Sequence, residues 1–192
     1  MEKKLNKYEY FGFTLLELMV TIAIAGILIV VAVPSFSQTI RNSRLTTNIN
    51  RLVASLNFAR SEAIKRNHAV SVRKNGTYWE SGWFIFADIN GNGVQNADDT
   101  LLREYDPMPI NFTLRATGIN RVTYRASGLS GNSSFVLCDN SDGNNIPESN
   151  TSKLMIINTV GRVRMGADND KNGIQEKFDG TEIISCTISP FT

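Results

Sequence analysis

The chain has little of what most catalytic and metal sites require. Among its 192 residues there is one histidine, His68, and there are two cysteines, Cys138 and Cys186. Few residues are therefore available for a Cys/His zinc site or for a triad or dyad with an imidazole base. Neither sign of charge dominates, since 20 basic residues face 18 acidic ones, so a nucleic-acid site would have to be local. These shortages predict a protein that is not an enzyme.

One long apolar run occupies residues 11–34, and Glu17 is its single charge. Residues 13–33 match the ~20 residues that a helix needs to cross a bilayer. Lysines precede the run, as is typical of a segment whose N-terminal side stays cytoplasmic. A secretory signal peptide or an ordinary anchor would give a similar run, but residues 33–35 match a small-x-small cleavage site poorly.

The stretch GFTLLELMVTIAIAGIL, residues 12–28, resembles the class III leader and N-terminal helix of type IV pilins and type II secretion pseudopilins. The resemblance implies that prepilin peptidase cleaves between Gly12 and Phe13 and that Phe13 is then N-methylated. Residues 1–12 would be the leader peptide. Pro34 matches the kink-forming proline of the family, which removes one helix hydrogen bond.

The resemblance also gives Glu17 a role, as the fifth residue after the cleavage point. It implies that Glu17 pairs with the α-amino group of Phe13 on a neighbouring subunit. An ionised, unpaired carboxylate in lipid costs roughly 2 kcal/mol or more, whereas an ammonium opposite it in low dielectric attracts it strongly. The implied partners are prepilin peptidase, other major and minor pilins, and the inner membrane before assembly, with the C-terminal head in the periplasm.

After Pro34, apolar residues recur at spacings of three and four, which predicts an amphipathic helix. We expect one helix from about Thr14 to Arg66, of which residues 34–66 pack on a head formed by 67–192. The expected packing stripe is Ile49, Leu52, Val53, Leu56, Ala59 and Ala63. Another face carries Arg44, Asn48, Arg51 and Ser55.

From His68 onward, short β-prone runs alternate with turn signals, and a hairpin marker stands at Asn75-Gly76. Further expected strands lie within 121–128, 133–139, 153–160, 161–165 and 181–188, and residues 139–152 read as a surface loop. The pattern predicts an α+β protein in which a long N-terminal α-helix packs on an antiparallel β-sheet head, as in the type IV pilin fold. Residues 82–105 resemble the GspH/FimT subgroup.

The two cysteines lie in strand-like runs of a head that the resemblance places in an oxidising compartment. We therefore expect a Cys138–Cys186 disulfide, with two buried free thiols as the alternative.

Two loops fit the ligand spacing of a calcium-binding loop, but no helices flank them, and the twelfth position is Asp rather than Glu. Ordinary turn chemistry is the favoured explanation, and calcium is the alternative. The loop residues are Asp88, Asn90, Asn92, Gly93 and Asp99 in the first loop, and Asp168, Asp170, Asn172, Gly173 and Asp179 in the second.

The sequence GRVRM, residues 161–165, resembles a motif of FimT-type minor pilins that bind DNA during natural transformation. In a strand, Arg162 and Arg164 would project to the same face, and Lys171 could extend the patch. The alternative is a hairpin whose arginines are solvated or paired with nearby acids (Asp168, Asp170 or Glu176). Without adjacent aromatic residues, we expect contacts with duplex phosphates rather than stacking on single-stranded bases.

Together these features predict a minor pilin of the GspH/FimT type. It would be built into a type IV pilus, support pilus assembly or priming, and bind double-stranded DNA for natural transformation. The alternative within the family is a pseudopilin of a type II protein secretion system. A membrane-anchored enzyme is the alternative outside it, and the missing catalytic groups argue against that.

Overall fold

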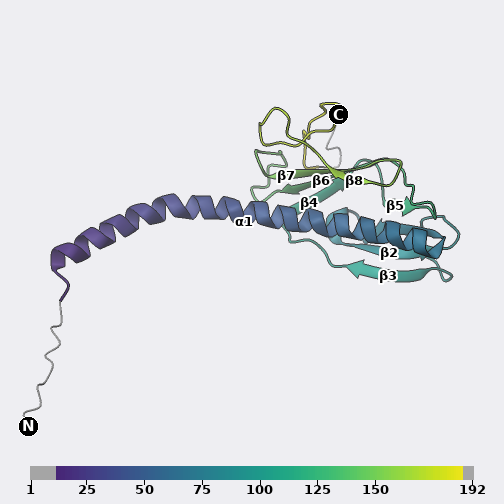
Figure 1. Ribbon diagram of the computed structural model, residues 1–192, viewed down its shortest axis with the longest axis horizontal. Coiled ribbons are helices and arrows are strands. Elements are labelled where there is room, and N and C mark those ends of the chain that lie inside the picture. The colour runs from purple at the N-terminus through teal and green to yellow at the C-terminus, as the bar shows by residue number, and fades with distance from the viewer. Residues whose placement is uncertain (1–11, 188–192) are drawn as a thin grey trace, which may run out of the picture. The chain divides into compact units, whose positions relative to one another are not determined.

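The computed structural model describes residues 12–187, which divide into two compact units between Ile40 and Arg41. One long helix, α1 (Leu15–Arg66), begins in the first unit and ends in the second, which we call the head unit (Figure 1). The described part of the head unit also contains one short 3₁₀ turn and eight strands. These are β1 (Ala69–Lys74), η1 (Trp79–Ser81), β2 (Trp83–Asp88), β3 (Thr100–Tyr105), β4 (Phe112–Ala116), β5 (Arg121–Tyr124), β6 (Ser133–Asp139), β7 (Ser152–Ile157) and β8 (Val163–Met165).

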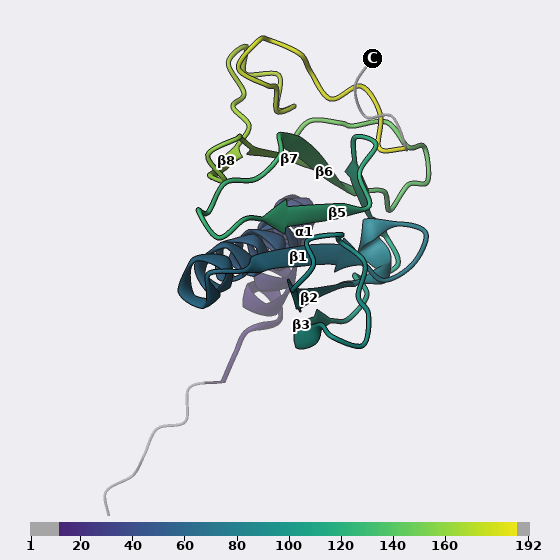
Figure 2. The ribbon, with the colours of Figure 1, turned by 90° about the vertical axis from the view of Figure 1, so that its right-hand side faces the viewer.

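The strands form two four-stranded sheets, in which every neighbouring pair is antiparallel. Sheet A has the order β3-β2-β1-β5 (Figure 2). Sheet B has the order β4-β6-β7-β8. The predicted class is confirmed: a long N-terminal helix packs on antiparallel sheets. The sequence did not indicate that the head has two sheets, nor that β4 is a strand.

The packing stripe of α1 is also confirmed, because its residues are buried against both sheets. Apolar positions of α1 at spacings of three and four are at most 1% exposed: Leu45, Ile49, Leu52, Leu56, Ala59 and Ala63. The same core cluster contains Val72 and Ile85 from sheet A and Phe135 and Leu137 from sheet B. Fully burying a Leu or Ile stabilises the fold by ~1.5–3 kcal/mol. This stripe therefore fixes residues 45–63 of α1 to the head unit.

Ser55 corrects the predicted polar face of α1. It is fully buried, and its hydroxyl accepts a hydrogen bond from Trp83 Nε1 at 2.9 Å. The guanidinium of Arg51 lies 5.2 Å from the centroid of the Trp83 ring and donates to the carbonyl of Asp106. A buried indole N–H needs an acceptor, and Ser55 supplies it. Polarity alone therefore misassigned Ser55 to solvent.

Two other local predictions differ in part from the structure. Residues 75–82, which contain η1, connect β1 to β2, and the Asn75 N–H bonds the Gly82 carbonyl at 2.8 Å. The predicted hairpin at Asn75-Gly76 is therefore confirmed, because β1 pairs antiparallel with β2, but its loop is longer than the two residues that Asn-Gly usually forms. Residues 181–187 contain no strand, only an isolated bridge at Glu182. The segment is held by its side chains, because Ile183 and Cys186 are buried against sheet B.

Candidate functional site: the N-terminal helix and the loops of the head

The start of α1 is defined by Thr14, which the sequence predicted as the approximate start of the helix but not as its cap. Thr14 precedes the helix, and its hydroxyl accepts a hydrogen bond from the Glu17 N–H at 3.2 Å. Thr14 is thus the N-cap of α1, and Thr-x-x-Glu is the sequence signature of a capping box. Glu17 lies in the first turn, where the helix dipole favours a negative charge. Glu17 therefore has a local role besides the predicted pairing with a neighbouring subunit.

The bond predicted for cleavage lies just before this cap. Gly12 and Phe13 have no regular secondary structure, and both are exposed. Extended, exposed backbone is what a peptidase needs to bind its substrate. The remainder of the predicted leader, residues 1–11, lies outside the described residues.

The first unit of the chain leaves its apolar side chains uncovered. Large apolar residues of α1 between Leu15 and Val30 are about half or more exposed: Leu15, Leu16, Leu18, Met19, Val20, Ile22, Ile24, Ile27, Leu28, Ile29 and Val30. An exposed apolar patch that extends over this many neighbouring side chains marks a membrane or protein contact in native proteins. Among the described residues, however, no helix has both the length and the apolarity required to cross a membrane. α1 continues through Pro34, and whether this proline kinks the helix stays a prediction.

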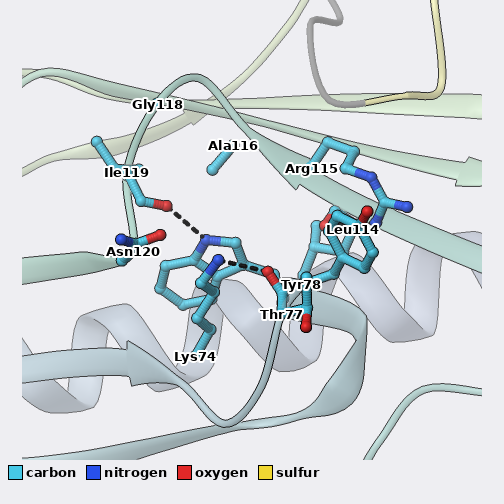
Figure 3. A pocket seen from close by; sticks show the side chains of 10 residues that line it. Lys74, Thr77, Tyr78, Leu114, Arg115, Ala116, Gly118, Ile119 and Asn120 are labelled. Atoms are coloured by element: carbon cyan, nitrogen blue, oxygen red, sulfur yellow. Dashed lines mark hydrogen bonds between the residues drawn. The ribbon is translucent and has the colours of Figure 1, made fainter.

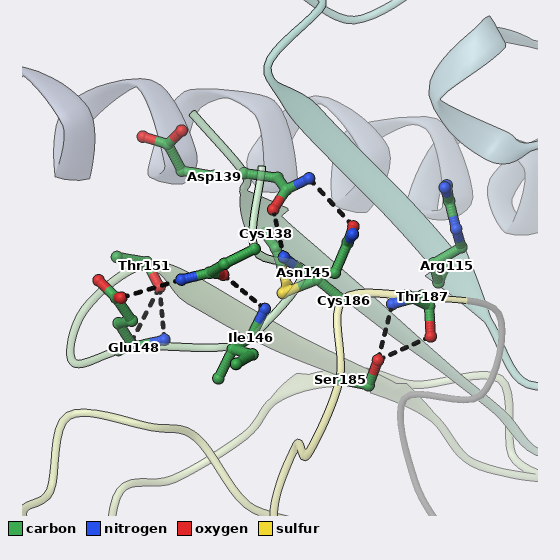
Figure 4. The surroundings of a disulfide bond; sticks show 12 residues. Arg115, Cys138, Asp139, Asn145, Ile146, Glu148, Thr151, Ser185, Cys186 and Thr187 are labelled. Atoms are coloured by element: carbon green, nitrogen blue, oxygen red, sulfur yellow. Dashed lines mark hydrogen bonds between the residues drawn. A yellow bond between two sulfur atoms is a disulfide. The ribbon is translucent and has the colours of Figure 1, made fainter. Parts of the chain in front are cut away.

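The predicted disulfide is confirmed: Cys138 and Cys186 are bonded, with their Cα atoms 5.9 Å apart (Figure 4). Alternate residues of β6 explain its position. Phe135 and Leu137 face the core that contains α1, whereas Val136 and Cys138 lie in a second cluster with Ile183 and Cys186. The disulfide therefore fixes the segment around residue 186 to sheet B.

Side-chain oxygens in the two candidate calcium loops accept hydrogen bonds from backbone N–H groups. In the first loop, Asp88 Oδ2 accepts from Gly93 N at 2.8 Å, and Asn92 Oδ1 accepts from Val94 N at 2.7 Å. Asp168 and Asn172 do the same in the second loop, with Gly173 N at 3.0 Å and Ile174 N at 2.7 Å. These bonds give both loops the favoured turn chemistry.

The residues at the twelfth position behave differently in the two loops. Asp99 closes the first loop by accepting from Ile89 N and Asn96 N. Asp179 instead accepts from Thr181, whose hydrogen bonds hold the pKa of Asp179 below its usual value. No cluster of three or more His, Cys, Asp or Glu side chains in residues 12–187 is arranged to hold a metal. Calcium stays an untested alternative for these loops.

The loop predicted at residues 139–152 contains the same pattern of hydrogen bonds, which the sequence had not indicated. Asn140 accepts from Asn145 N at 2.9 Å, Asp142 from Asn144 N at 3.2 Å, and Asn144 from Ile146 N at 2.7 Å. Asn145 takes the positive φ, 59°, that glycine takes in the other two loops. The signal was the alternation of Asn and Asp at 140, 142 and 144, hidden because the sixth position holds Asn145 instead of glycine.

The candidate DNA-binding arginines lie at an edge of sheet B. Arg164 belongs to β8, Arg162 precedes it, and both side chains are exposed. The predicted alternative of pairing with nearby acids is not observed, because the ion pairs of the described residues involve only Glu62 and Glu80. Lys171 is exposed on the second turn loop.

Phe178 corrects the expectation that no aromatic side chain adjoins these arginines. Its ring centroid lies 5.5 Å from the guanidinium carbon of Arg164, and the side chain is 71% exposed. The sequence separation of the two residues concealed this contact. An exposed ring beside a cation is a surface on which a base can stack, so the ground for favouring duplex over single-stranded DNA is removed.

Gly161, the first residue of the GRVRM motif, has a structural role. Its φ is +72°, and a Cβ at this position would lie 2.1 Å from the carbonyl oxygen of Gly128. Arg60 of α1 holds both loops by donating to the carbonyls of Gly128 and Val160, each at 3.1 Å. The glycine is thus required by the contact between two loops, whatever the arginines bind.

We expect Gly161→Ala to lower the free energy of unfolding by about 2–4 kcal/mol, as a strained backbone and a backbone clash combine. Gly118→Ala is the matched control, because Gly118 also has a positive φ, 65°, but has open space around it. The control should lose only about 1 kcal/mol. Urea unfolding followed by circular dichroism measures both, and equal losses would contradict the predicted clash.

A cavity of about 240 Å³ lies beside η1 and the segment that follows β4 (Figure 3). Trp79 Nε1 donates to the Ile119 carbonyl at 3.1 Å, and Arg115 pairs with Glu80 and lies over the Tyr78 ring. The residues that line the cavity include no histidine, cysteine or carboxylate. Its polar groups join η1 to β4 and do not form a nucleophile–base arrangement.

Comparisons with known families match two parts of the chain. The family described as "Type II transport protein GspH" matches residues 48–161, and the "Prokaryotic N-terminal methylation motif" matches residues 10–33. The comparison with curated proteins returns no match.

Similar solved structures include two crystal forms of one minor pilin and one minor pseudopilin. The type IV minor pilin FimU of Pseudomonas aeruginosa, in space group P21, is 20% identical over 76% of this chain and 96% of its own, with a TM-score of 0.56. A second crystal form of FimU, in space group P65, is 21% identical over 74% and 100%, with a TM-score of 0.54. The minor pseudopilin EpsH of the Vibrio cholerae Type 2 Secretion System is 12% identical over 65% and 97%, with a TM-score of 0.47.

Proposed function

Because the chain belongs to the GspH family of pseudopilins and minor pilins, we propose that it is a minor pilin built into a type IV pilus, where it supports pilus assembly. Proteins of this family are structural and non-enzymatic. The observation that carries the proposal is the uncovered apolar surface of α1 between Leu15 and Val30. Neighbouring helices of the same kind would bury that surface, at ~1.5–3 kcal/mol for each large side chain.

Glu17 would give this association its register. After cleavage before Phe13, the new α-amino group of one subunit would lie opposite the Glu17 carboxylate of its neighbour. Before assembly, the apolar helix would be held in the inner membrane, where an unpaired carboxylate is costly. A subunit in the filament, with Glu17 paired, would therefore have a lower free energy than a single subunit in the membrane, with Glu17 unpaired.

A pseudopilin of a type II secretion system is the competing function, and the description of the matched family favours it. FimU, a type IV minor pilin, favours the pilus. The deletion strain separates the two functions. Loss of surface pili and of twitching with normal export of secreted enzymes supports a pilus subunit, whereas normal pili with blocked export would overturn this assignment.

DNA binding is a second candidate function, favoured by two exposed arginines that form no ion pair in the described part of the chain. Arg162, Arg164 and Lys171 would contact phosphates, and Phe178 would offer a ring beside Arg164. Contacts of this kind are independent of base sequence and weaken strongly as salt is raised.

We expect Arg162→Gln with Arg164→Gln to weaken DNA binding by the full-length chain in detergent about tenfold at low salt, as two phosphate contacts are lost. Arg44→Gln is the matched control, because it removes an exposed arginine elsewhere in the head unit. Fluorescence anisotropy with labelled duplex and single-stranded oligonucleotides measures the affinities. Unchanged affinity for both in the double variant would end the DNA hypothesis and leave the pilus assignment intact.

A further inference from the structure

Sheet A ends at β5, whose outer edge is open. The Lys74 N–H donates to the Asn120 carbonyl at 3.2 Å, so this pair is hydrogen-bonded. Hydrogen-bonded pairs alternate along an antiparallel ladder, so Val122 also bonds to β1, whereas the backbone groups of Arg121 and Thr123 point outward. No other strand in the described residues pairs with this edge.

A groove of about 670 Å³ runs beside this edge. Residues 121–123 of β5 line it together with residues 129–133 and Thr159. Ser130 also lines the groove, but its hydroxyl oxygen is buried and has no hydrogen-bond partner in the described part of the chain. The edge ends where the Arg125 N–H bonds the Leu129 carbonyl at 2.9 Å. The groove thus offers the unpaired strand groups of Arg121 and Thr123.

The charged side chains of the groove are all positive. Arg121 and Arg125 line it and are exposed. Arg73 stands directly opposite Arg121 in the pairing of β1 with β5 and donates to the Gly93 carbonyl. Like charges directly opposite one another destabilise a sheet. None of the three arginines forms an ion pair among the described residues, so a carboxylate in the groove would relieve their repulsion.

We propose that the open edge of β5 binds an extended, acid-bearing segment of a partner protein, which joins sheet A as an additional strand. Its backbone pairs with the N–H and C=O groups of Arg121 and Thr123, and its carboxylates meet Arg121 and Arg125. This is peptide recognition by strand addition. The assignment is independent of whether the chain serves a pilus or a secretion system.

A peptide fits this groove better than a nucleic acid does. Phosphates could meet the arginines and accept from the outward N–H groups of Arg121 and Thr123, but they carry no donor for the outward C=O groups, which a peptide strand satisfies. Among residues 12–187, no aromatic side chain lines the groove to stack a base.

To test the proposal, a short synthetic peptide that alternates Thr and Glu is titrated into the full-length chain in detergent. Calorimetry measures the heat of binding. Thr123→Pro removes an N–H that points to the open edge and leaves the ladder to β1 intact. Thr123→Val is the matched control, because both variants lose the hydroxyl bond to Ser71 but only proline loses the N–H. We expect the proline variant to bind about tenfold more weakly than the valine variant.

Equal affinities of the two folded variants would overturn strand addition, as would the absence of any binding by the natural chain. An equally tight complex with a peptide that alternates Thr and Lys would overturn the proposed charge preference. If Arg121→Gln with Arg125→Gln weakens binding of duplex DNA but not of the acidic peptide, the groove binds nucleic acid and the proposal is wrong.

If the proline variant does not fold, hydrogen exchange of the Arg121 and Thr123 amides in the natural chain tests the proposal instead. The proposal predicts that the acidic peptide slows hydrogen exchange at these two amides. Unchanged exchange rates would contradict it.

Discussion

Replacement of Glu17 by Val is expected to leave the chain in the membrane fraction and to reduce its amount in isolated filaments at least about tenfold. The apolar surface of α1 is unchanged by this replacement, so membrane insertion has no reason to fail. What is lost is the attraction between a carboxylate and an α-amino group in low dielectric, which is worth several kcal/mol when the partners are well placed. Quantitative immunoblots of membranes and sheared filaments give both amounts.

The local role of Glu17 has to be separated from this pairing. Thr14→Ala removes the N-cap of α1 and keeps the charge, at a cost of about 1 kcal/mol in helix stability. Glu17→Gln keeps the shape of the side chain and removes the charge. Pairing between subunits predicts that the Gln variant fails to enter filaments and that the Ala variant enters them. If both variants are reduced alike, the helix cap explains the effect and the pairing argument is wrong.

Removal of the disulfide by Cys138→Ser is expected to destabilise the head by about 2–4 kcal/mol. The bond joins residues separated by 48 positions, so its loss frees a large loop in the unfolded chain. It also releases an anchored segment, because the Cys186 N–H bonds the Asn145 carbonyl at 3.0 Å. For a unit of this size, the midpoint of thermal unfolding should fall by about 10 °C.

Thermal unfolding with and without a reductant provides the control for this prediction. The reductant should lower the midpoint of the natural chain to that of the variant in which both cysteines are serine. It should leave that variant unchanged. A midpoint of the double variant within about 2 °C of the natural value would show that noncovalent contacts, such as the packing of Ile183, are sufficient to hold the segment to sheet B.

The elements that the sequence predicted well are those fixed by periodicity or by covalent chemistry. The stripe from Ile49 to Ala63 repeats at helical spacing, and all its predicted members except Val53, which is partly buried, lie in the core. The cysteines were predicted to pair because the family resemblance implies an oxidising compartment for the head. In each case a short-range pattern or a single chemical fact was sufficient.

The elements that the sequence missed depend on contacts between distant segments. Ser55 is buried only because Trp83 of β2 needs an acceptor there. Phe178 lies beside Arg164 because the C-terminal loops return over sheet B. The open edge of β5 depends on which strands pair, which short β-prone runs do not specify. All three features depend on which distant segments pack together, and a single sequence contains only indirect information on that packing.

The central claim is that the chain is processed before Phe13 and assembled through its N-terminal helix. Mass spectrometry of purified filaments tests this most directly. The prediction is a peptide that begins with N-methylated Phe13 and contains Glu17, present in filaments and absent from a strain that lacks prepilin peptidase. Filaments free of the chain, or a chain that retains the residues before Phe13, would contradict it.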